Sequence, residues 1–195
     1  MKIIPPKVGF GKGRNISRAQ CLKWDETIVK KNGFNLPHWD QDGVIQFITF
    51  RLKDSLPASK LEELTELRTE ISETDPFELE KIDYWLNQGI GECLLKYEKV
   101  QEIIIDALNY YDGKRFDLFD YVIMPNHVHL IVIPYDDPDK IFQDFKRYTA
   151  RQINKLLNRK GELWQAEIFD RIIRSIKDYN ERAEYIRQNP TPSKP

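Results

Sequence analysis

The sequence contains few of the residues that build disulfide frameworks or zinc clusters. Its 195 residues include only 2 cysteines and 3 histidines. Cys21 and Cys93 lie far apart and neither belongs to a Cys-x-x-Cys pair, so a disulfide-stabilised domain and a structural zinc cluster are not indicated. No apolar run approaches the roughly 18 uncharged residues that a membrane span requires. We therefore expect a soluble, cytoplasmic protein without a membrane partner.

A strong net charge is also absent, but the charges are unevenly distributed. The formal net charge is -1, yet residues 140–195 carry 13 basic and 7 acidic side chains, against 17 and 24 in residues 1–139. Aromatic residues are interleaved with the basic ones, as expected where a protein follows a phosphate backbone and stacks on bases; solvated helix faces are the alternative. The candidate DNA contacts are Lys146, Arg147, Arg151, Lys155, Arg171 and Arg174, of which the last two could instead pair with Asp170 or Asp178.

Hydrophobic periodicity predicts an α+β protein. Residues 1–40 are rich in Gly, Pro, Lys and Asn without a lasting period, so we expect a partly ordered extension over residues 1–37. The predicted elements are a strand at 44–52, helices at 58–73, 77–86 and 100–111, strands at 116–124 and 127–134, a helix at 138–158, an extended piece after Trp164 and a last helix. This order favours one ferredoxin-like sandwich over residues 38–195, with helices packed on a largely antiparallel sheet.

The last helix has clear start and stop signals. Ser175 opens a segment that resembles a capping box, in which a serine side chain accepts a hydrogen bond from a backbone N–H three residues later. Pro190 pushes Asn189 away from the α region and so ends the helix. Tyr185 is therefore predicted to lie in its final turns.

Two of the three histidines stand one residue apart in MPNHVHLIVIP, residues 124–134. Side chains at positions i and i+2 of a strand share one face, roughly 6.6 Å apart along the chain, so His127 and His129 point the same way. Two imidazoles can then converge on one ion. Metal binding is favoured on these grounds over two buried histidines satisfied by carbonyl groups.

These residues also resemble a known family. MPNHVH from Met124, preceded by FDYVI, is similar to the HUH motif (His, hydrophobic, His) of single-tyrosine transposases. Five further segments resemble one branch, the REP-associated tyrosine transposases: HWDQDGVIQFITFRL from His38, GECLL from Gly91, RYTARQINKLL from Arg147, LWQAEIFDRIIR from Leu163 and EYIRQNP from Glu184. Together they cover about residues 36–190, and their order is more specific than the histidine pair alone.

The resemblance implies a set of site residues. Tyr185 holds the position of the family's nucleophile, and His127 and His129 match its paired metal ligands. Asn189 falls where related transposases carry a glutamine as third ligand, four residues after the tyrosine and on the same side of a helix. The implied cofactor is Mg²⁺ or Mn²⁺. Because this ligand set adds no negative charge, we expect weak ion binding without DNA, and imidazole suits Mn²⁺ better than Mg²⁺.

The implied function is a metal-dependent DNA transesterase. It would cleave and rejoin single-stranded hairpin DNA of the palindromic REP type through a 5′-phosphotyrosine intermediate, as a monomer or homodimer. Two alternatives remain: a non-catalytic palindrome-binding protein of the same fold, and a hydrolase in which His38 joins the pair in a three-histidine zinc site. The intact set of His127, His129 and Tyr185 argues against lost chemistry, and His38 lies in a segment that resembles the family outside its metal site.

Overall fold

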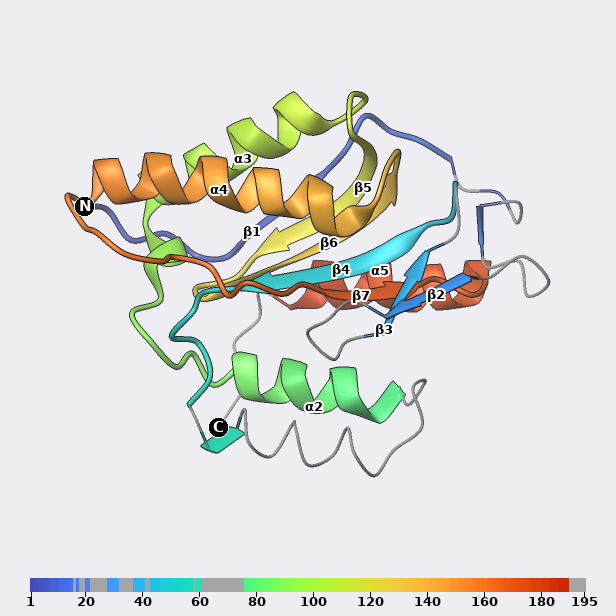
Figure 1. Cartoon of the computed structure of the whole chain (residues 1–195), viewed down its shortest axis with the longest axis horizontal. Coiled ribbons are helices and arrows are strands. Elements are labelled where there is room, and N and C mark those ends of the chain that lie inside the picture. The colour runs from blue at the N-terminus through green and yellow to red at the C-terminus, as the bar shows by residue number, and fades with distance from the viewer. Residues whose placement is uncertain are drawn as a thin grey trace.

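A computed structural model of the chain shows a central sheet with helices on both faces (Figure 1). It describes residues 1–15, 17, 20–21, 28–31, 37–40, 43–57, 59–60 and 76–189. The predicted helix at 58–73 falls almost wholly outside these residues.

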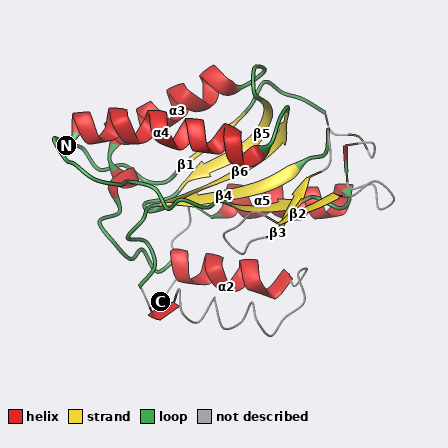
Figure 2. Ribbon diagram, in the orientation of Figure 1, coloured by secondary structure: helices red, strands yellow, loops and turns green. Residues whose placement is uncertain are grey.

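The helices and strands follow the predicted order from residue 44 onward (Figure 2). The strands are β1 (Lys7–Phe10), β2 (Ile28–Lys31), β3 (Pro37–Asp40), β4 (Gln46–Arg51), β5 (Phe116–Ile123), β6 (His127–Pro134) and β7 (Phe169–Ile172). The helices are α2 (Pro76–Leu86), the short 3-10 helix η2 (Leu94–Lys96), α3 (Glu98–Tyr111), α4 (Pro138–Leu156) and α5 (Ile176–Gln188). Within the described part of the chain, no helix is both long and apolar enough to cross a membrane.

The main sheet confirms the predicted ferredoxin-like architecture. Its strand order is β1-β5-β6-β4-β7, and every neighbouring pair is antiparallel. The elements β4, α3, β5, β6, α4 and β7 form the strand-helix-strand-strand-helix-strand unit of that fold. Helices α3 and α4 cover one face of the sheet, whereas α5 and α2 lie on the other side (Figure 1).

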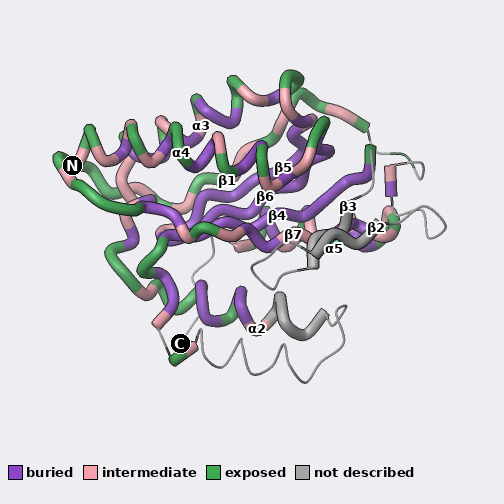
Figure 3. The backbone as a smooth tube through the Cα atoms, viewed as in Figure 1, coloured by how far each residue is buried: buried purple, intermediate pink, exposed green. Residues whose placement is uncertain are grey.

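The central strands are buried along their whole length, because both faces of the sheet are covered (Figure 3). Successive residues of β6 therefore enter different cores. Val128 and Leu130 pack with Phe142 of α4, whereas Ile131 packs with Ile186 of α5. Each fully buried aliphatic side chain stabilises the fold by roughly 1.5–3 kcal/mol. By the same alternation, the side chains of His127 and His129 lie on the face of the sheet that α5 covers.

The sequence analysis predicted no strand before residue 44, but three lie among the residues described there. β1 forms the edge of the main sheet, antiparallel to β5, and β2 and β3 form a separate two-stranded ladder. A Cβ atom on Gly9 would lie 2.2 Å from the ring of Tyr121, and one on Gly11 would lie 1.8 Å from the Leu118 carbonyl oxygen. The glycines that made this segment look irregular are therefore what lets it approach β5 closely.

Lys146 is a buried residue of α4. Its ammonium donates to the backbone carbonyls of Gln165, Ala166 and Glu167, the segment that leads into β7. Burial lowers the pKa of Lys146 to about 8. In this conformation the side chain joins α4 to the next segment of the chain and does not face solvent.

Replacing Lys146 with Met should lower the free energy of unfolding by about 2 kcal/mol, because three carbonyls lose a charged donor. The neighbouring Arg147→Met change is the matched control: this side chain is 61% exposed and makes a surface pair with Asp144, so we expect a loss within about 0.5 kcal/mol. Urea denaturation followed by tryptophan fluorescence measures both. Equal stability of the two variants would contradict a structural role for Lys146.

Candidate active site

The two histidines lie at the start of β6, directly after the Pro125-Asn126 turn: His127 is the first residue of the strand and His129 the third. Their backbone register on β4 places His127 opposite Arg51 and His129 opposite Thr49. Both imidazoles point toward the α5 side of the sheet, as the spacing of two predicts. His129 lies over the ring of Phe47, with a centroid distance of 5.2 Å.

Hydrogen bonds at Nδ1 fix the orientation of both rings. Asn126 Nδ2 donates to the carbonyls of Leu86 and Ile90, both at 3.1 Å, so its Oδ1 faces His127 Nδ1 at 2.7 Å and can only accept. His127 Nδ1 therefore carries the proton and its Nε2 does not. His129 Nδ1 lies 2.8 Å from Thr49 Oγ1. This leaves the Nε2 atoms of the two histidines facing each other. Because His127 Nε2 carries no proton, His129 Nε2 is the donor between them, and its proton would have to move to Nδ1 before both Nε2 atoms could bind a metal.

The two imidazoles are neutral at physiological pH. Both side chains are fully buried, and desolvation lowers the pKa of His127 to about 3 and that of His129 well below its usual value. Their Nε2 atoms lie only 3.0 Å apart, a distance at which one nitrogen donates a hydrogen bond to the other. Neutral imidazole is also the form that ligates metals.

The spacing of the two Nε2 atoms fits a divalent cation. Two nitrogens bound about 2.1 Å from one ion and at right angles are about 3.0 Å apart, whereas tetrahedral geometry would separate them by about 3.4 Å. The observed 3.0 Å matches adjacent positions of an octahedral ion. Among the described residues, no three His, Cys, Asp or Glu side chains converge as a ready-made metal site.

Tyr185 lies beside the histidine pair. Ser175 starts α5 as predicted, with its side chain accepting from the backbone N–H of Asp178. Ten residues later, the Tyr185 ring stands 5.5 Å from the His129 ring and 6.4 Å from the Phe47 ring, measured between centroids. Burial, and next the nearby Asp83 carboxylate, raise the pKa of Tyr185 well above its usual value, so the phenol is protonated at neutral pH.

Asn189 lies next to Tyr185 at the end of α5. Asn189 caps the helix: its backbone N–H donates to the Tyr185 carbonyl at 2.9 Å, and its φ of -58° and ψ of -27° lie in the α region. The expectation that Pro190 pushes Asn189 out of this region was therefore wrong, although α5 does end at Gln188. Within the described residues, Tyr185 Oη and Asn189 Nδ2 are both buried without a well-formed hydrogen bond. Asn189 and Asn87 nevertheless lie close enough to lower the pKa of Tyr185, in opposition to burial. The tyrosine and the asparagine are thus brought together as their spacing predicts.

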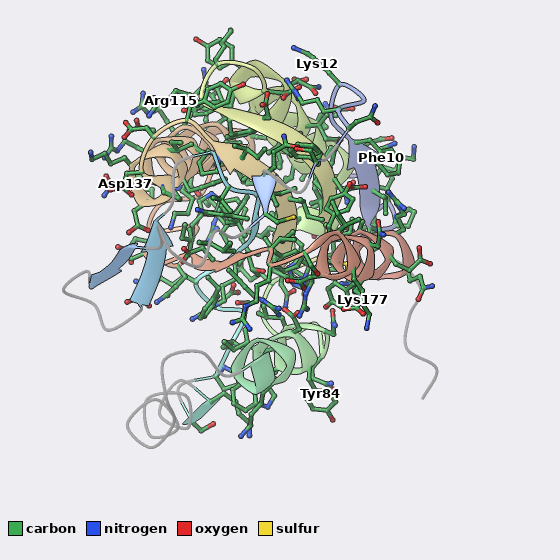
Figure 4. The ribbon with its side chains drawn as sticks, turned by 90° about the vertical axis from the view of Figure 1, so that its right-hand side faces the viewer. Phe10, Lys12, Tyr84, Arg115, Asp137 and Lys177 are labelled. Atoms are coloured by element: carbon green, nitrogen blue, oxygen red, sulfur yellow. The ribbon has the colours of Figure 1, made fainter. Side chains whose placement is uncertain are left out.

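Asp83 is a site residue that sequence reasoning missed. It lies on α2, and its Oδ1 is 3.8 Å from His129 Nε2. Figure 4 shows Tyr84 pointing away from the sheet, whereas Asp83, one residue earlier, is buried. No motif surrounds Asp83, and 46 residues separate it from His129, so only the tertiary structure reveals the contact.

On the face of the sheet that carries the histidines, three arginines lie around the carboxylate of Asp178. Arg171 Nη2 donates to both oxygens of this carboxylate, each at 3.2 Å, and the backbone N–H of Arg174 donates to one of them at 2.9 Å. Arg182, another residue that the sequence analysis did not single out, lies 3.7 Å from Asp178 and over the Phe47 ring. Pairing of Arg171 with Asp178, given as an alternative from the sequence, is therefore present.

The other candidate DNA contacts lie across the sheet from the histidines. Arg147, Arg151 and Lys155 are exposed on α4, whose apolar side packs on the opposite face of the sheet from α5. Of the aromatic residues interleaved with the basic ones, Tyr148 is exposed, whereas three are buried: Phe145, Trp164 and Phe169. His38 lies on β3, in the separate two-stranded ladder.

Comparisons with known proteins agree with the resemblance stated from the sequence. Residues 94–189 match the family described as "Transposase IS200 like". The chain is 32% identical over 96 residues to a REP-associated tyrosine transposase of Escherichia coli (strain K12), and the alignment covers 49% of this chain and 54% of that protein. The chain thus spans about half the length of this curated relative. A solved structure described as "Structure of the REP associates tyrosine transposase bound to a REP hairpin" aligns with a TM-score of 0.43 at 21% identity, covering 78% of this chain and 70% of that chain.

Replacing Asn126 with Ala should lower the free energy of unfolding by about 3 kcal/mol, because two buried carbonyls and the His127 Nδ1–H lose their partner. In addition, ¹⁵N NMR of the imidazole should show that His127 no longer keeps a single tautomer. Asn109→Ala, at an exposed position of α3, is the control and should change neither quantity. An unaltered His127 spectrum in Asn126→Ala would refute the orienting role.

Proposed function

Residues 94–189 are similar to the IS200-like transposases, and on this premise we propose that the protein cleaves and rejoins single-stranded hairpin DNA of the palindromic REP type, with Tyr185 as nucleophile. One observation carries the proposal: Tyr185 and the histidine pair meet at one place from different elements. The Nε2 atoms of His127 and His129 lie 3.0 Å apart, and the Tyr185 ring is 5.5 Å from that of His129. A phenol beside a pair of metal-binding nitrogens is the arrangement that phosphodiester transesterification needs.

The protein's own contribution is to hold these groups in place. Asn126 and Thr49 set the two rings so that both Nε2 atoms face the same point. A Mg²⁺ or Mn²⁺ ion held by His127, His129 and Asn189 would withdraw charge from the scissile phosphate. Helix α5 presents Tyr185 to that point and, four residues later, Asn189.

The proposed reaction exchanges one phosphoester bond for another. The Tyr185 oxygen bonds to phosphorus and loses its proton, and the bond between phosphorus and the 3′-oxygen breaks. The departing oxygen takes up a proton and becomes a free 3′-hydroxyl, while the 5′ end stays attached as a phosphotyrosine. Attack of a 3′-hydroxyl on this phosphotyrosine reverses the exchange and rejoins the strand.

Access to the tyrosine must involve movement of neighbouring groups. Tyr185 Oη and both histidines are buried, so a DNA phosphate does not reach them in this conformation. Helix α2 borders the site through Asp83 and packs through a small apolar cluster that is separate from the two main cores: Leu56, Ile82, Trp85, Leu86 and Phe169. A small separate cluster opens at lower cost than a main core.

The proposal predicts that Tyr185→Phe abolishes the covalent protein–DNA adduct. The change removes one oxygen and keeps the ring, so packing on Phe47 and His129 should be retained while the nucleophile is lost. The measurement is denaturing gel electrophoresis after incubation with a labelled REP-like hairpin oligonucleotide and Mn²⁺. We expect an adduct at the 5′ end of the cut strand with the unaltered protein and none with Tyr185→Phe.

Tyr179→Phe is the matched control on the same helix. Its hydroxyl donates to Asp120 at 2.7 Å, away from the histidines, so we expect a small loss of stability and normal adduct formation. If Tyr185→Phe still forms the adduct and Tyr179→Phe does not, the nucleophile is Tyr179. Cleavage that neither change affects means that water attacks and the protein is a hydrolase. DNA binding without any cutting means that it is a palindrome-binding protein.

A second prediction concerns the exposed basic side of α4. Arg147→Ala combined with Arg151→Ala should weaken binding to many DNA sequences alike, and the slope of log affinity against log salt should fall by about two. Fluorescence anisotropy over a series of salt concentrations measures this slope. The control removes two other exposed charges, Lys2 and Lys12, and should leave the slope unchanged. An unchanged slope in the arginine variant would place the DNA elsewhere.

A further inference from the structure

The contact between Asp83 and His129 joins the segment that matches the transposase family to a residue outside it. That match begins at residue 94, whereas Asp83 belongs to α2, in the stretch between β4 and η2. Its carboxylate is buried and 3.8 Å from His129 Nε2, the nitrogen that faces His127. An acidic side chain has thus been brought to the histidine pair by an element that the family match does not include.

The distance allows one ion to contact both groups. Two ligand atoms on opposite sides of one small divalent cation are about 4.2 Å apart, and adjacent ones about 3.0 Å. The 3.8 Å between Asp83 Oδ1 and His129 Nε2 is within this range but matches neither octahedral value. The carboxylate of Asp83 and the imidazoles of His127 and His129 do not converge on one point in this structure, so the carboxylate would have to move toward the two rings to share an ion with them.

Hydrogen bonds and apolar packing hold the backbone of α2 close to Asp83. Asn126, which orients His127, also donates through Nδ2 to the carbonyl of Leu86, the last residue of α2, and to that of Ile90, which follows the helix. Ile82 and Leu86 are buried in the small apolar cluster on either side of Asp83. One side chain therefore ties the helix that carries the carboxylate to the strand that carries the imidazoles.

The negative charge of Asp83 would strengthen the binding of a divalent cation at the histidine pair. Two neutral imidazoles and an amide offer a hard cation no negative charge, and Mg²⁺ and Mn²⁺ prefer oxygen ligands. A carboxylate supplies both the charge and the oxygen. Two histidines with one carboxylate also form a recurrent ligand set for divalent first-row metals.

We propose that Asp83 is a further ligand of the divalent cation at His127 and His129, supplied by α2, so that the protein binds Mn²⁺ before it binds DNA. This inference rests on the metal requirement of the proposed function. It replaces the expectation from sequence that the site binds ions weakly without DNA, because that expectation counted no acidic ligand.

The test measures Mn²⁺ binding to the full chain in the absence of DNA. Isothermal titration calorimetry gives the affinity, and electron spin echo modulation of bound Mn²⁺ detects imidazole nitrogens as ligands. We expect Asp83→Asn to weaken Mn²⁺ binding at least about tenfold while the remaining bound ion keeps its nitrogen signal. His127→Ala should lose that signal. Thermal unfolding without metal checks that each variant is folded.

Glu184→Gln is the control for charge alone. It removes one negative charge from an exposed position next to Tyr185 on α5, and its Mn²⁺ affinity should equal that of the unaltered protein. Equal affinity of Asp83→Asn would overturn the inference and leave the histidine site intact. More adduct formation by Asp83→Asn at unchanged Mn²⁺ affinity would also overturn it, since Asp83 would then block the site. Absence of nitrogen-coordinated Mn²⁺ in the unaltered protein would remove the inference together with the metal part of the proposed function, whereas the Tyr185 adduct assay tests the nucleophile separately.

Discussion

The buried side chain of Asn126 is the interaction on which the arrangement of the site depends. Its amide has one donor end and one acceptor end, and the fold uses them for different elements. The donor end holds the chain that follows α2, and the acceptor end holds the Nδ1–H of His127. A buried amide with these partners has one orientation, and the ring of His127 inherits it. The turn before β6 thus determines both where α2 ends and which histidine nitrogen faces the site.

The alternation of side chains along β6 divides them between the two faces of the sheet. Odd-numbered residues from His127 to Ile133 face α5, where the phenol of Tyr185 and the arginines around Asp178 lie. Even-numbered residues form the core under α3 and α4, and the basic surface of α4 is therefore a sheet thickness away from the histidines. Under the proposed function, a nucleic acid strand could contact both surfaces only around an edge of the sheet.

Local signals in the sequence predicted a large part of this structure. The shared face of His127 and His129 follows from the two-residue period of a strand, and the start of α5 follows from the chemistry of Ser175. Asp83 could not be found in this way, because its contact depends on how α2 packs across the sheet. Lys146 has the spacing of an exposed basic residue on a helix, and only the position of the 165–167 carbonyls makes it internal. Patterns along the chain reveal periodicity and caps, whereas packing between distant segments decides which polar residues are enclosed.

The N-terminal strand has a consequence for the protein's behaviour in solution. β1 lies along the outer side of β5 from Asp120 to Ile123, so the backbone of this part of β5 already has a partner strand. Gly9 and Gly11 make this possible through their close approach to Tyr121 and Leu118. Loss of the first eleven residues would leave the half of β5 that pairs with β1, Asp120 to Ile123, with an open edge, the kind of surface that recruits a strand from another molecule. By covering this edge, β1 therefore prevents self-association of the sheet at β5.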